Sequence, residues 1–245
     1  MGYTISGIIV DKLPEPTPND NGIPLDAKYQ IESNTNLCPK KLTIGFKNRA
    51  TYIFLDNIYY KNMSEEEGLT KLESDINRIF PGSGFLSIMM NETSDIYGYS
   101  LINKGQKIRT KCVMQGRQFL DFGELNPFEQ KLEKEIQEYL KDKPNVKIKI
   151  DEHTKSMNQL DASKFHLIYR DKLYRRNKLA NPYEYLGGGL DSYVIDKLFQ
   201  GTMKCDFQEI EMTEAVVFDK KKLDFNKDSL SPFIYTAFGQ LNNNR

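Results

Sequence analysis

The chain has 245 residues with 14 Tyr and 14 Phe, enough aromatic surface for a folded core, and long disorder is not expected. Its 34 basic and 34 acidic residues cancel, so no overall field attracts nucleic acid or an anionic membrane. The three cysteines have no CxxC spacing, which argues against a disulfide framework and a zinc site. No apolar run approaches the roughly 20 residues of a membrane span. We therefore expect a cytoplasmic protein that does not enter a membrane.

The N-terminal quarter of the chain predicts strands. Residues 3–10 alternate as a strand, and residues 42–46 and 51–60 are rich in aromatic and β-branched residues, with Asn48 in a turn between them. Four prolines in residues 14–24 predict a loop, because proline removes a backbone donor.

Residues 64–140 carry the clearest pattern. Ser64 and Glu67 match a capping box, which predicts a helix over residues 64–80 with an apolar stripe at spacings of three and four. Asn126-Pro127-Phe128-Glu129 predicts the start of a second helix over residues 127–141. The predicted strands between the two helices are 85–90, 96–102, 108–114 and 119–122, with a hairpin turn at residues 103–106.

The strand at 108–114 has alternating character. Apolar or small side chains alternate with basic ones, which predicts one buried face and one solvated face. The apolar face is Ile108, Thr110, Cys112 and Met114, and the basic face is Lys107, Arg109 and Lys111. The basic face, with Arg117 after the next turn, could bind a partner, or it could protect the strand against aggregation.

Together these elements predict an α+β protein. We expect a mainly antiparallel sheet with two amphipathic helices, 64–80 and 127–141, on one face and a more helical C-terminal part. In that part Asp191 is expected to cap a helix that Gly201 ends, and residues 208–219 resemble a late strand at an edge of the sheet. Residues 1–245 are expected to form a single domain, with a weak subdivision near 141–164 as the alternative.

Gly187, Gly188 and Gly189 precede this predicted helix, and backbone amides at a helix start can hold a phosphate. With Tyr185-Leu186 and the helix that follows, the loop slightly resembles the glycine-containing loop-helix of the actin and Hsp70 ATPase family, which implies phosphate binding. The chain lacks that family's Asp- and Gly-rich loop near the N-terminus and the lysine of a Walker loop. The alternative is a loop that lets a helix leave the core at an angle.

Catalytic candidates are His166, Asp121 and Glu124. An unperturbed histidine titrates near neutrality, and the two carboxylates flank a predicted strand-to-helix turn where they could act as acid and base. His153 and His166 have no metal-ligand spacing, so the sequence predicts no metal site and no cofactor.

Arg170, Arg175 and Arg176 lie among tyrosines in the strongest local cluster of basic residues. Guanidinium groups and aromatic rings together suit phosphate or single-stranded nucleic acid. The alternative is a solvated helix face, which the overall neutrality of the chain favours over nucleic-acid binding.

These features leave two hypotheses for function. The first is a non-enzymatic protein that binds a protein partner, favoured by the lack of a catalytic motif and by the many tyrosines, a common interface residue. The alternative is a hydrolase or phosphate-ester-acting enzyme that uses carboxylates or His166. The oligomeric state is left open by the sequence.

Overall fold

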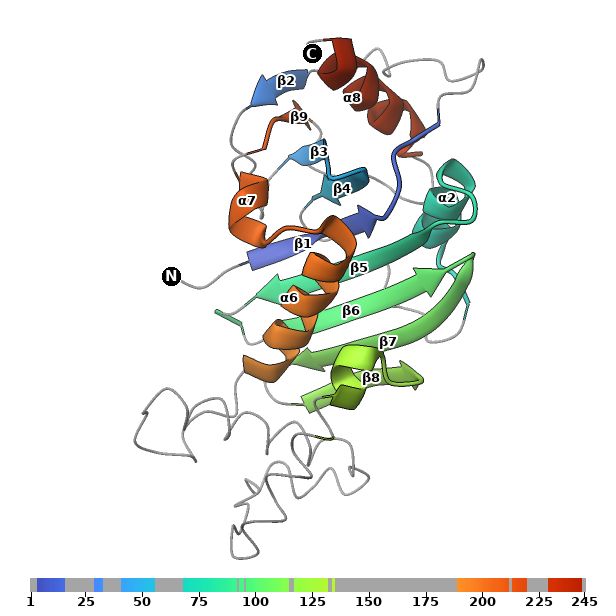
Figure 1. Cartoon of the computed structure of the whole chain (residues 1–245), viewed down its shortest axis with the longest axis vertical. Helices are drawn as coiled ribbons and strands as arrows, with labels where there is room; N and C mark the ends of the chain where they lie inside the picture. The colour runs from blue at the N-terminus through green and yellow to red at the C-terminus, as the bar shows by residue number, and fades with distance from the viewer. Residues whose placement is uncertain are drawn as a thin grey trace, which may run out of the picture.

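The computed structural model describes residues 4–15, 29–32, 41–55, 68–91, 93–94, 96–114, 117–131, 134, 189–211, 213–219 and 229–243. Within these residues nine strands form one sheet in the order β2-β9-β3-β4-β1-β5-β6-β7-β8, and each neighbouring pair is antiparallel (Figure 1). The strands are β1 (Thr4–Val10), β2 (Tyr29–Glu32), β3 (Leu42–Lys47), β4 (Ala50–Phe54), β5 (Gly84–Asn91), β6 (Ile96–Asn103), β7 (Gln106–Met114), β8 (Arg117–Gly123) and β9 (Ala215–Phe218). The helices are α2 (Lys71–Ile79), α6 (Gly189–Met203), α7 (Phe207–Glu211) and α8 (Ser231–Asn243). The predicted α+β class with a mainly antiparallel sheet is confirmed.

The sheet is buried on both faces, because alternate residues of its strands enter separate apolar clusters, of which two are large. In β1, Ile5 and Ile9 belong to a core with α6 and α7, which we call the front core. Ile8 and Val10 belong to a core with α2 and α8, which we call the back core. Figure 1 shows α6 lying across β5 and β6, which it contacts together with β1.

The two helices predicted for one face lie on opposite faces. Leu72 and Ile76 of α2 enter the back core, whereas Phe128, in the helical segment 127–131, packs against the front core. An apolar stripe determines which side of a helix is buried, but it carries no information on which face of the sheet covers it.

Helix α2 begins later than predicted. Its N-cap is Thr70, whose Oγ1 accepts the amide of Glu73 at 3.2 Å, while Glu73 Oε2 accepts the amide of Thr70 at 2.8 Å. Residues 68–70 are not helical, and Gly68 has a φ of 84°. The predicted capping box at Ser64 and Glu67 lies outside the described residues. Thr70 and Glu73 also match the capping-box motif. Gly68, in the left-handed conformation, lies between the predicted box and the observed one.

Two predicted hairpin turns are confirmed. Asn48 and Arg49 join β3 to β4, and Lys104 and Gly105 join β6 to β7, each with positive φ at both central residues. This backbone conformation matches the twist of the flanking strands.

The C-terminal part differs from its prediction in three ways. Helix α6 begins before Asp191 and continues through Gly201, so neither residue marks an end of the helix. Residues 208–211 belong to α7, and of the described residues in the predicted segment only 215–218 form a strand. That strand, β9, lies between β2 and β3 and not at an edge. Among the helices described, none is long and apolar enough to cross a membrane. Residues 141–164 lie outside the described residues, so the domain division stays a prediction.

Candidate functional site: buried charges on strand β7

Strand β7 brings its basic side chains into the interior. Lys107, Arg109 and Lys111 are 8%, 2% and 2% exposed, whereas Ile108 is 46% exposed. The prediction that the basic side chains of this strand face solvent while Ile108 is buried is therefore wrong. A basic binding surface on this strand is no longer available, because the three side chains lie inside the protein.

A β-bulge places Lys107 and Arg109 on opposite faces of the sheet, and both faces are covered along this strand, since Thr110 and Cys112 are also buried. Leu101 of β6 pairs with Arg109, and the next residue, Ile102, pairs with Lys107, so Ile108 has no partner on β6. An extra residue in one strand reverses the alternation of side chains beyond it. Leu101 packs against the front core and Ile102 belongs to the back core. Arg109 therefore faces the front core and Lys107 the back core.

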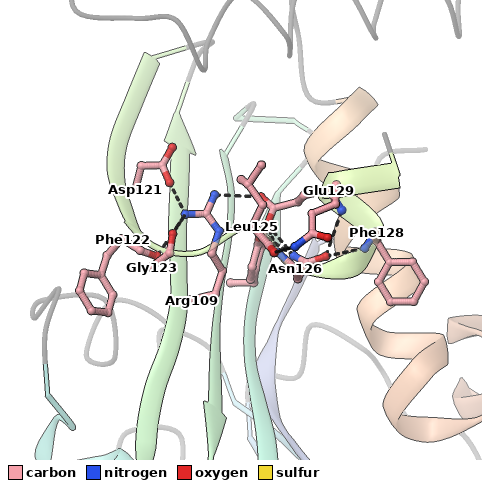
Figure 2. A network of polar contacts seen from close by, with 10 residues as sticks. Arg109, Asp121, Phe122, Gly123, Leu125, Asn126, Phe128 and Glu129 are labelled. Atoms are coloured by element: carbon pink, nitrogen blue, oxygen red, sulfur yellow. Dashed lines mark hydrogen bonds and ion pairs between the residues drawn. The ribbon is translucent and has the colours of Figure 1, made fainter. Parts of the chain in front are cut away.

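Arg109 is the centre of a polar network between β7, β8 and the helical segment 127–131 (Figure 2). Its Nε and Nη2 donate to the two carboxylate oxygens of Glu129 at 3.0 and 2.9 Å. Its Nη1 donates to the carboxylate of Asp121 and to the carbonyls of Phe122 and Gly123, the latter two at 3.1 and 3.3 Å. The planar guanidinium thus joins the end of β8 to the start of the helix.

Asn126 and Glu129 cap this helix reciprocally. Asn126 Oδ1 accepts the amides of Phe128 and Glu129 at 3.0 and 3.1 Å, and Glu129 Oε2 accepts the amide of Asn126 at 3.0 Å. The side-chain amide of Asn126 also donates to Glu129 at 2.7 Å and to the hydroxyl of Tyr99 at 3.1 Å. The helix start that the sequence predicts here is confirmed, and it is a capping box.

The pKa directions follow from this geometry. Burial alone would raise the pKa of Glu129, but the hydrogen bonds from Arg109 and the charges of Lys111 and Arg109 hold it below its usual value. Burial would lower the pKa of Arg109, yet Glu129 and Asp121 raise it. Burial and the Glu129 charge raise the pKa of Tyr99 well above its usual value. The network therefore keeps Glu129 and Arg109 charged and Tyr99 neutral.

A second buried pair lies on the back face. Lys107 Nζ is 3.0 Å from Glu73 Oε2, and both side chains are fully buried. Burial raises the pKa of Glu73 despite the hydrogen bond from the Thr70 amide and the charge of Lys107. Glu73 Oε1 is buried and has no hydrogen-bond partner among the described residues. This carboxylate is therefore less well satisfied than that of Glu129.

Both pairs attach the start of a helix to strand β7. A guanidinium does not release its proton under physiological conditions, and Arg109 directs its donors at acceptors within the protein. Within the described ranges, no three His, Cys, Asp or Glu side chains gather as metal ligands do. What the arrangement does is hold two helix starts against the sheet.

Some predicted site residues can be located. Asp121 lies in the Arg109 network, and Glu124 is exposed in the turn that follows β8. Gly189 is the first residue of α6. The other predicted site residues, which lie outside the described part of the chain, are His166, Arg170, Arg175, Arg176, Gly187 and Gly188. Among the described residues, no hydrogen bond or ion pair joins any two of these three.

The interpretation of the sequence did not identify the two buried pairs: it placed Lys107 and Arg109 on a solvated face, and it gave neither Glu73 nor Glu129 a basic partner. A signal for the acidic partners was present, because both glutamates stand three residues after a capping side chain, Thr70 or Asn126. No comparable local signal distinguishes a buried arginine in a strand from a solvated one.

Comparison with protein-family models, with curated proteins and with solved structures finds no match to this chain.

Proposed function

We propose that this chain is a non-enzymatic protein that acts by binding a protein partner. The proposal is supported by the role of the buried charges, which bind groups inside the protein. Arg109 and Lys107 hold the capping carboxylates of two helices, and those carboxylates hold the helix starts. Charged groups that are bound in this way make a scaffold rigid, and a rigid surface loses less entropy when it binds.

The composition agrees with this proposal. The chain contains 14 Tyr, a residue that is enriched at protein interfaces because it combines a large apolar surface with a hydroxyl. The buried charges of β7 serve the fold, and recognition of a partner would use surface contacts and would not need a reactive side chain.

The experiment uses the full chain, purified and immobilised. We expect it to recover a protein from native lysate in stoichiometric amount, and the two purified components to form a complex that is measurable by calorimetry. A chain that recovers no stoichiometric partner would count against the proposal.

A turnover assay distinguishes the enzymatic alternative. The chain is incubated with p-nitrophenyl phosphate and p-nitrophenyl acetate, with and without Mg²⁺. The proposal expects no turnover above buffer. Turnover that disappears in the His166→Ala or Asp121→Asn variant would favour a hydrolase and contradict the proposal.

A further inference from the structure

The bulge in β7 separates two ion pairs that would otherwise compete for one face of the sheet. Lys107 and Arg109 are two residues apart, and in a regular strand they would point to the same side. With Ile108 unpaired on β6, Lys107 reaches Glu73 in the back layer and Arg109 reaches Glu129 on the front side. A shift of β7 by one residue would move both basic side chains away from their acidic partners.

Both acidic partners occupy the same position in their helices. Glu73 and Glu129 are the third helical residues of capping boxes begun by Thr70 and Asn126. Each carboxylate accepts the amide of its N-cap residue and also the basic group of β7. The position of β7 thus determines whether the capping carboxylates of two helices, which lie on opposite faces of the sheet, have their basic partners.

We infer that the bulge at Ile108 couples the two helix starts across the sheet. Loss of the Lys107–Glu73 pair on the back face frees the bulge to shift, and that shift weakens the Arg109–Glu129 pair on the front face. The coupling is a conformational property of the strand, and it works in both directions because linkage between two sites is reciprocal.

The test is native-state hydrogen exchange in the Lys107→Met variant. The reporting amides are those of Asn126 and Glu129, which are bonded within the front-face capping box. We expect their protection, relative to that of global unfolding, to fall about twofold or more, since coupled sites interact by at least about 0.5 kcal/mol. The matched control is Ile234→Val, a buried position of α8 on the back face that does not belong to β7.

A second variant covers the case in which Lys107→Met does not fold. Glu73→Gln keeps an oxygen that can accept the amide of Thr70 and removes only the charge, and the same front-face amides are followed. In the reverse direction, Arg109→Lys should lower the relative protection of the Thr70 and Glu73 amides. Front-face protection that falls no further in the back-face variant than in Ile234→Val would overturn the inference.

Discussion

The two ion pairs of β7 have the same arrangement, but their carboxylates differ in hydrogen bonding. Lys107 meets Glu73 through one contact, the second oxygen of Glu73 has no hydrogen-bond partner among the described residues, and burial raises the pKa of that carboxyl. Arg109 meets Glu129 through two parallel contacts, and these lower the pKa of Glu129 although it is also buried. At Glu129 the hydrogen bonds from Arg109 and the charges of Lys111 and Arg109 outweigh burial, whereas at Glu73 the hydrogen bonds from Thr70 and the charge of Lys107 do not.

The largest expected effect is that of removing the stronger cation. Arg109→Met leaves the buried Glu129 without its two hydrogen bonds from the guanidinium and also removes a donor from the carbonyls of Phe122 and Gly123. We expect the free energy of unfolding to fall by about 3 to 5 kcal/mol, measured by urea denaturation. Lys107→Met should cost less, about 1 to 3 kcal/mol, because Glu73 can take up a proton once its single cation is gone.

The control for this pair of variants is Lys104→Met, in the exposed turn before β7. It removes the same kind of charge and should change the free energy of unfolding by no more than about 0.5 kcal/mol. Equal losses for Arg109→Met and Lys107→Met would show that the two pairs do not differ as their hydrogen bonds indicate.

The glycines beside the two pairs provide a second comparison. A Cβ at Gly123 would lie 2.0 Å from the carbonyl oxygen of Ile108, and its φ is 83°. The atoms nearest to a Cβ at Gly105 would be those of the Asn77 side chain, the first at 3.0 Å, with a φ of 74°. We expect Gly123→Ala to cost about 2 to 3 kcal/mol and Gly105→Ala about 1 kcal/mol, measured as shifts of the urea midpoint.

Gly105→Ala is the matched control here, since both variants carry the strain of a left-handed alanine and only Gly123→Ala clashes with backbone. If the two substitutions cost the same, the close approach of β8 to the bulge does not contribute to stability.

Local patterns predicted many strands of this fold, because the alternation in β1, the apolar run of β5 and the turn chemistry at Asn48 and Gly105 depend on near neighbours in the sequence. The candidate site could not be predicted in the same way. The bulge at Ile108 arises from the pairing of β7 with β6, and a regular alternation places Lys107 and Arg109 on a solvated face. Which face a helix covers also depends on partners distant in the sequence, and here α2 and the segment 127–131 were wrongly assigned to one face.

Substitution of the two N-cap residues compares the front and back faces through smaller changes in the free energy of unfolding. Asn126 bonds the helix amides, Glu129 and Tyr99, whereas the hydroxyl of Thr70 accepts the amide of Glu73. We expect Asn126→Ala to lower the free energy of unfolding by about 2 kcal/mol and Thr70→Ala by about 1 kcal/mol, measured by thermal or urea denaturation.

Thr70→Ser keeps the hydroxyl and should recover most of the loss at that cap. A loss for Thr70→Ala that matches or exceeds the loss for Asn126→Ala would contradict the stronger attachment of the front-face helix.

The smallest expected effect is a difference in pH dependence, and its sign distinguishes the two pairs. The pKa of Glu129 lies below the ordinary value of 4.5, so its contribution to stability is present above that value and is lost as the pH falls through the lowered pKa. The pKa of Glu73 lies above 4.5, so its contribution is present below that value and is lost as the pH rises through the raised pKa. We expect the advantage of the wild type over Glu129→Gln to shrink on acidification, and its advantage over Glu73→Gln to shrink as the pH rises.

The measurement is the free energy of unfolding from urea titrations at a series of pH values, starting below the ordinary carboxyl pKa and ending near neutrality. The free energy of unfolding of each variant is subtracted from that of the wild type. The contributions of the other carboxylates cancel in this difference, because both proteins contain them. The double variant Glu73→Gln, Glu129→Gln should lack both contributions. Difference curves with the same slope would mean that the two buried carboxylates are stabilised alike. The additional hydrogen bonds from Arg109 and Asn126 and the charge of Lys111 would then not distinguish Glu129 from Glu73.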